Sequence, residues 1–179
     1  MVDRRTLLLG APLLMAAAPS AARAWDFTFP GIDGPPLPLA QFRDQVLLVT
    51  NTASFCGFTY QYEGLQKLHE ALHARGFSVI GVPSGDFNQE SDSNDKVKQF
   101  CEVTFGIDFP LAALSHVRGE AAHPFYRWVR EEGFGEPRWN FSKVLVGRDG
   151  RIRAMFGSSD RPDGARLQEA IEQALAETA

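Results

Sequence analysis

The sequence predicts an α/β domain in which helices flank a mixed central sheet. Two short apolar runs rich in β-branched residues, 45–51 and 77–82, are each followed by a helical pattern. That order gives parallel strands joined by crossover helices. Two later runs, 143–147 and 152–156, flank an Asp-Gly pair and so predict an antiparallel hairpin. The length of 179 residues suits one such domain.

The first half of the chain contains the two parallel strands. Residues 25–38 are rich in Pro and Gly and predict an extended segment with a short hairpin between 27–29 and 37–39. Both following runs have the near-continuous apolar character of strands buried on two faces. Between them, leucines at helical spacing predict a helix over 61–75, which Gly76 ends.

The rest of the chain alternates helices with the hairpin. We expect a helix over about 94–103 with Val97, Phe100 and Cys101 directed inward. Residues 109–114 predict irregular structure or a short strand. Further helices are expected over 123–132 and 161–176, the latter with Pro162 in its first turn. This order is that of a thioredoxin-like fold with an insertion between its halves.

Residues 1–24 have the features of a cleavable export signal. Arg4-Arg5 precedes a short apolar stretch, and Ala22-Arg23-Ala24 is a small-x-small cleavage site. The start resembles a twin-arginine signal, although an ordinary secretory signal or an uncleaved anchor would fit too. We therefore expect a periplasmic protein whose single mature domain spans 25–179.

Composition excludes several classes of protein. The formal net charge of −4 argues against a nucleic-acid partner, which usually meets a basic face. No apolar stretch reaches the ~20 residues that span a bilayer. Two cysteines are too few for a disulfide framework or a four-cysteine zinc site.

Cys56 is the first candidate for chemistry. It follows a buried strand directly and precedes a helix, so its sulfur should lie at the carboxyl end of the sheet, where α/β sites form. Main-chain N–H groups and the helix N-terminus there favour a nucleophilic thiolate. Position alone leaves an inert, buried cysteine equally open, because free cysteines are often buried.

Three separated blocks resemble the glutathione peroxidase family. Residues 51–65 resemble the family's signature around its peroxidatic cysteine or selenocysteine, and 81–90 and 137–146 resemble its second and third blocks. The resemblance covers nearly the whole mature chain. It implies a thioredoxin-like fold and reduction of hydrogen peroxide and organic or lipid hydroperoxides.

The family's catalytic tetrad corresponds to four residues of this chain. The resemblance gives Cys56 the peroxidatic role and places Gln89, Trp139 and Asn140 as its partners. Neutral N–H donors of this kind could stabilise negative charge on sulfur. One residue departs from the pattern: only Asn88 separates Phe87 from Gln89, where the family commonly has two. The reach of Gln89 to Cys56 is therefore open, and Asn88 could substitute.

Cys101 matches the resolving cysteine of relatives that use thioredoxin. In that role its thiol would condense with a Cys56 sulfenic acid to form an intramolecular disulfide, which a dithiol protein would reduce. The helix around Cys101 would have to unwind locally. The alternative is that Cys101 only fills the core.

Other residue groups indicate neither a metal nor a bound cofactor. His69 and His73 have metal-compatible spacing, but we expect them on a solvated helix face.

The segment between His123 and Trp139 is short, which resembles monomeric family members that accept bulky lipid hydroperoxides. The expected reductant is a thioredoxin-like dithiol protein, or else glutathione.

Two other functions stay open from the sequence. A peroxide sensor or relay would pass oxidation from Cys56 to a partner protein. A binding domain on the same scaffold would leave Cys56 inert toward peroxide.

Overall fold

A four-stranded mixed sheet forms the centre of the computed structural model, which describes residues 22–177. Its strands are β3 (Val46–Thr52), β4 (Phe77–Pro83), β5 (Lys143–Val146) and β6 (Ile152–Phe156), in the order β4-β3-β5-β6. β3 and β4 are parallel, while β5 pairs antiparallel with β3 and with β6. The mixed sheet and its hairpin confirm the predicted fold class.

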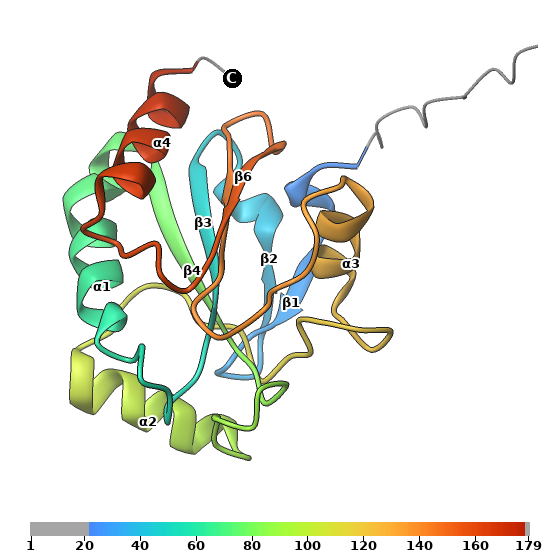
Figure 1. The fold of residues 1–179 in the computed structure, drawn as a ribbon, viewed down its shortest axis with the longest axis vertical. Helices are drawn as coiled ribbons and strands as arrows, with labels where there is room; N and C mark the ends of the chain where they lie inside the picture. The colour runs from blue at the N-terminus through green and yellow to red at the C-terminus, as the bar shows by residue number, and fades with distance from the viewer. Residues whose placement is uncertain (1–21, 178–179) are drawn as a thin grey trace, which may run out of the picture.

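The helices cover both faces of this sheet. They are α1 (Gln61–Leu72), α2 (Asn94–Phe105), α3 (Pro124–Glu131) and α4 (Ala165–Ala176). Figure 1 shows α1 and α4 on one side of the sheet and α3 on the other. All seven residues of β3 and of β4 are buried, as expected for strands covered on both faces.

Two apolar clusters make the core. One lies under α1, α2 and α4 and includes Leu48, Tyr62 and Cys101. The other lies under α3 and the N-terminal segment and includes Leu47, Trp25 and Trp128. Leu47 and Leu48 are neighbours in β3, so the two clusters lie on opposite faces of the sheet, as the alternation of strand side chains requires.

The N-terminal segment packs against the second cluster. It contains the 3₁₀ turn η1 (Ala24–Asp26), the predicted hairpin of β1 (Thr28–Pro30) and β2 (Pro36–Pro38), and the 3₁₀ turn η2 (Leu39–Phe42). The N–H of Ala24 donates to the carbonyl of Gly150 at 2.9 Å. The export signal expected over residues 1–24 lies outside the described residues apart from its last three, so it stays a prediction.

Two expectations from the sequence are wrong. Pro162 does not open the last helix, because residues 161–164 form a turn in which the Gly164 N–H donates to the Arg161 carbonyl, and α4 begins at Ala165. His69 does not lie on a solvated face. It is 9% exposed and accepts a hydrogen bond at Nδ1 from the N–H of Val79, and burial lowers its pKa.

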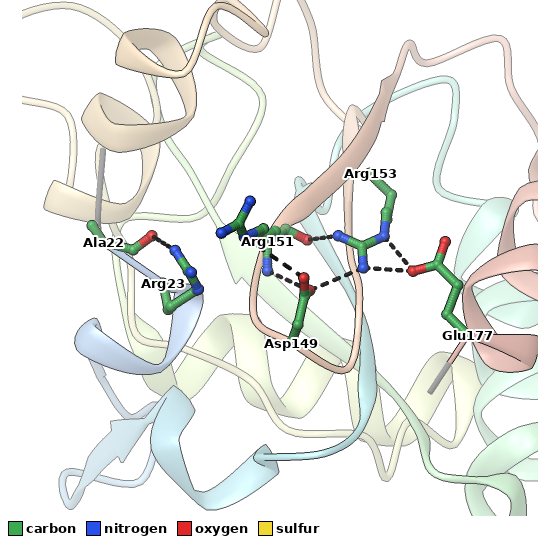
Figure 2. A network of polar contacts seen from close by, with 6 residues as sticks. All are labelled: Ala22, Arg23, Asp149, Arg151, Arg153 and Glu177. Atoms are coloured by element: carbon green, nitrogen blue, oxygen red, sulfur yellow. Dashed lines mark hydrogen bonds and ion pairs between the residues drawn. The ribbon is translucent and has the colours of Figure 1, made fainter. Parts of the chain in front are cut away.

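A polar network joins the β5–β6 hairpin to the chain's last helix. Arg153 of β6 contacts Asp149 in the hairpin turn and Glu177 just after α4 (Figure 2). Asp149 also accepts a hydrogen bond from the Arg151 N–H. The network therefore fixes the hairpin turn relative to α4.

Residues 22–177 contain neither a membrane-spanning helix nor a cluster of metal-ligating side chains. No helix there has the length and apolar character to cross a membrane. In the same range, no group of three or more His, Cys, Asp and Glu residues is arranged to hold a metal ion.

Candidate active site

Cys56 lies in a tight turn between the end of β3 and the start of α1. Its side chain is 5% exposed. The N–H of Phe58 donates to its sulfur at 3.4 Å, and the N–H of Thr59 donates to its carbonyl. A main-chain N–H directed at a sulfur near a helix N-terminus stabilises the thiolate. The turn therefore has the local geometry that a nucleophilic cysteine needs.

The loop of Gln89 is attached to the Cys56 turn through the main chain. The N–H of Phe55 donates to the carbonyl of Gln89 at 2.9 Å. Next to it, the N–H of Ser54 donates to the Glu90 carboxylate at 3.1 Å, and burial raises the pKa of that carboxyl. The loop, one residue shorter than the family pattern, thus still lies directly beside the residue before Cys56.

Asn88 and Gln89 occupy different environments in this loop. Asn88 is exposed and has a positive φ of 56°, a conformation that asparagine tolerates better than most residues. Gln89 is half-buried, and its Oε1 accepts a hydrogen bond from Asn140 Nδ2 at 2.9 Å. Gln89 is therefore the better placed of the two to act with Asn140.

Asn140 is completely buried. Its bond to Gln89 joins the turn before β5 to the loop after β4. Asn140 Oδ1 has no hydrogen-bond partner among the described residues. A buried amide with one satisfied and one free end is costly unless a substrate or water completes it, which is the condition expected at a reaction site.

Trp139 lies at the rim of this site. Its side chain is 41% exposed and packs against the Phe87 ring at 5.3 Å between centroids. The Trp139 carbonyl accepts hydrogen bonds from the side chains of Asn51 and Ser142. Asn51 belongs to β3, five residues before Cys56, so the strand that positions the cysteine also fixes this turn.

Cys101 is buried in α2, and both cysteines are free thiols. Burial raises the pKa of Cys101 to about 11; the Tyr62 hydroxyl opposes this rise, and the negative charges of Glu90 and Glu102 add to it. The thiol packs in the same apolar cluster as Cys56. In this state the Cys101 thiol is enclosed in the core.

Lys143 is a residue near the site that the sequence analysis did not single out. It is completely buried in β5, and its Nζ donates to Gln61 Oε1 and to the Phe141 carbonyl, both at 2.7 Å. Burial lowers its pKa to about 7, an effect that Asp160 partly offsets. The signal available in the sequence was a lysine at the start of an otherwise apolar strand.

Comparison with known proteins identifies the family of this chain and several relatives. Residues 24–130 match the family model for glutathione peroxidase. The chain is 38% identical over 148 residues to glutathione peroxidase-like peroxiredoxin gpx1 of Schizosaccharomyces pombe, covering 80% of this chain and 92% of the relative. It is 39% identical over 150 residues to hydroperoxy fatty acid reductase gpx1 of Synechocystis, covering 78% and 89%. Thioredoxin/glutathione peroxidase BtuE of Escherichia coli is 36% identical over 170 residues, covering 81% and 93%.

Solved structures give the same picture of the fold. The crystal structure of Trgpx in apo form matches with a TM-score of 0.72 at 32% identity, covering 89% of this chain and 99% of that one. A thioredoxin family thiol:disulfide interchange protein from Chlorobium tepidum matches with a TM-score of 0.66 at 18% identity, covering 90% and 99%. The second likeness confirms the thioredoxin-like fold alone.

Proposed function

Because this chain belongs to the glutathione peroxidase family and is a peroxidase, we propose that it works as a two-cysteine thiol peroxidase. Cys56 is the peroxidatic residue, and Cys101 is the resolving residue. Gln89, Trp139 and Asn140 assist Cys56. The observation that carries this assignment is the pair of bonds that joins Gln89 to Phe55 and to Asn140, since it unites three distant segments beside the cysteine.

In the first step the Cys56 thiolate attacks one oxygen of a hydroperoxide. The O–O bond breaks, the sulfur becomes a sulfenic acid, and the other oxygen leaves as water or alcohol after taking up a proton. Neutral donors near sulfur stabilise its negative charge without holding a fixed cation there. The Phe58 N–H donates to the sulfur in this structure. We assign the same role to the Asn140 amide, whose Nδ2 donates to Gln89 Oε1 here, and to the exposed Trp139 ring.

In the second step the Cys101 thiol attacks the Cys56 sulfenic acid. A disulfide forms and one water leaves. Cys101 is fully buried on α2, and we propose that α2 opens locally so that the two Cα atoms come within the ~7 Å that a disulfide requires. A dithiol protein of the thioredoxin type then reduces the disulfide by exchange, with glutathione as the alternative reductant.

Lipid hydroperoxides are included among the proposed substrates. Trp139 and Phe55 expose apolar ring surface, which a long acyl chain would contact. The relative from Synechocystis is a hydroperoxy fatty acid reductase by name. We further propose that the protein is exported to the periplasm and acts there as a monomer, which makes its reductant a periplasmic dithiol protein.

Intact mass of the reduced protein after one equivalent of hydrogen peroxide tests the cycle. The wild type should lose the mass of two hydrogens, and Cys101→Ser should instead gain one oxygen that a sulfenic-acid probe traps at Cys56. Cys56→Ser should stay unchanged at this dose. A wild type that gains oxygen at Cys56 without forming the disulfide would remove the resolving role and make glutathione the leading reductant.

Kinetics separate the peroxidase from a relay. A peroxidase turns over hydroperoxide steadily with a small dithiol donor. Slow turnover together with rapid oxidation of a partner protein would favour the relay, and a Cys56 that does not react would leave only a binding role.

A further inference from the structure

Lys143 is an unusual residue for the place it occupies. All four residues of β5 are buried, and Lys143 is completely so. A buried ammonium is costly unless its protons find acceptors. Lys143 Nζ finds two uncharged ones, Gln61 Oε1 and the carbonyl of Phe141. The position of these two acceptors indicates what the lysine does.

The acceptors belong to the two segments that carry the site. Gln61 is the first residue of α1 and follows the Cys56 turn, while Phe141 follows Asn140 directly. One ammonium group therefore spans the gap between the start of α1 and the turn before β5. Both bonds are 2.7 Å long, so the spacing between these segments is set closely.

A second route closes the connection. Gln61 Nε2 donates to the carbonyl of Ser158 at 2.6 Å, and Ser158 Oγ donates to the carbonyl of Asn140 at 2.6 Å. The path from Phe141 through Lys143, Gln61 and Ser158 returns to Asn140, the neighbour of Phe141. The main-chain carbonyls of Asn140 and Phe141 thus each accept a hydrogen bond from a side chain of this path.

The turn needs this support because its backbone is strained. Phe141 has a φ of 59°, a left-handed conformation that is unfavourable for a bulky residue. The carbonyls of Trp139, Asn140 and Phe141 each accept a side-chain hydrogen bond. These bonds stabilise the conformation in which Asn140 Nδ2 is directed at Gln89.

We propose that Lys143, acting with Gln61 and Ser158, is a positioning residue that fixes the distance between the Cys56 turn and Asn140. This role rests on the proposed peroxidase function. Lys143 acts through Asn140 and does not touch the peroxide. A neutral lysine still has two N–H donors, so the connection survives loss of the lysine proton.

A double-mutant cycle on the rate of Cys56 oxidation tests this role. The rate constant for sulfenic acid formation with hydrogen peroxide is measured in the Cys101→Ser background, where the product persists. Lys143→Met keeps the unbranched side chain up to the position of Cε and removes both bonds. It should lower the rate about tenfold, and Asn140→Ala about 10- to 100-fold, the range for a lost hydrogen bond to a charged group.

The combined variant decides between positioning and a general loss of stability. If Lys143 acts through Asn140, adding Lys143→Met to Asn140→Ala should lower the rate by less than about twofold, since coupled residues are not additive. Ser158→Ala removes one hydrogen bond and no charge. It should lower the rate less than Lys143→Met does, and its effect should likewise largely vanish in the Asn140→Ala background. Val129→Ala, in the core on the opposite face, controls for destabilisation and should react at the parent rate.

The two proposals fail in different ways. If the Cys101→Ser parent does not form a sulfenic acid at all, the proposed function is wrong. The positioning role is wrong if the parent reacts and Lys143→Met reacts equally fast. It is also wrong if the fold-losses in rate of Lys143→Met and Asn140→Ala multiply in the combined variant.

Discussion

Replacing Gly106 by alanine should speed disulfide formation about fivefold. Gly106 ends α2 with φ 61° and ψ 35°, and its N–H donates to the carbonyls of Cys101 and Glu102. The next N–H, of Ile107, also donates to the Cys101 carbonyl. This cap therefore holds the turn of helix that encloses the resolving thiol, and weakening it should make α2 open more often.

The size of the effect follows from the local geometry. A Cβ on Gly106 would meet no atom within 4 Å, so alanine adds backbone strain without a clash. The left-handed conformation costs alanine about 1 kcal/mol more than glycine, which raises the opening equilibrium of α2 about fivefold. If opening precedes a slower attack, the rate of disulfide formation rises by the same factor.

Rapid mixing with less than one equivalent of hydrogen peroxide, quenching with a thiol-alkylating agent and intact mass would give this rate. Gly133→Ala is a matched control, because Gly133 also has a positive φ of 89° and a Cβ added there would meet no atom within 4 Å, but Gly133 follows α3. It should lower the free energy of unfolding similarly and leave disulfide formation unchanged. Equal rates in Gly106→Ala and wild type, or equal acceleration in both variants, would refute local opening of α2.

Three further outcomes are expected. Gln89→Ala should slow Cys56 oxidation at least tenfold in stopped-flow kinetics, whereas Asn88→Ala should leave the rate unchanged. A slower rate in Asn88→Ala and an unchanged rate in Gln89→Ala would make Asn88 the partner of Cys56. Because burial raises the pKa of Cys101 to about 11, its alkylation by iodoacetamide should rise about tenfold per pH unit from pH 7 to 10, and a plateau near pH 8.5 would contradict this. Burial lowers the pKa of Lys143 to about 7, so the unfolded state binds more protons above pH 7. The free energy of unfolding should therefore rise by about 1.5 kcal/mol between pH 7 and 8.5, a rise that Lys143→Met abolishes in urea titrations.

The elements that the sequence predicted well are those with strong local patterns. β3 and β4 are continuous apolar runs, and the Asp-Gly turn set the β5–β6 hairpin. Pro162 misled because proline suits the first turn of a helix, yet the turn closed by Gly164 delays the start of α4. The preference of Pro162 for the first turn of a helix was outweighed by the turn that the Gly164 N–H closes.

The residues that the sequence placed wrongly or missed depend on distant partners. His69 is buried, and the N–H of Val79, in another element, satisfies its Nδ1. Lys143 is satisfied by Gln61, 82 positions away along the chain. The attachment of the shortened Gln89 loop comes from a main-chain bond to Phe55, and a main-chain bond leaves no mark on residue type.

The polar network at Arg153 has a consequence for self-association. β6 is an edge strand of the sheet, and an open edge can pair with the same edge of another molecule. Arg151 and Arg153 place positive charge along this edge, and Arg153 is held there by Asp149 and Glu177. Two copies meeting edge to edge would have to rearrange or desolvate these ion pairs before the strands could pair. The network that fixes the hairpin should thus also make pairing along the β6 edge less favourable.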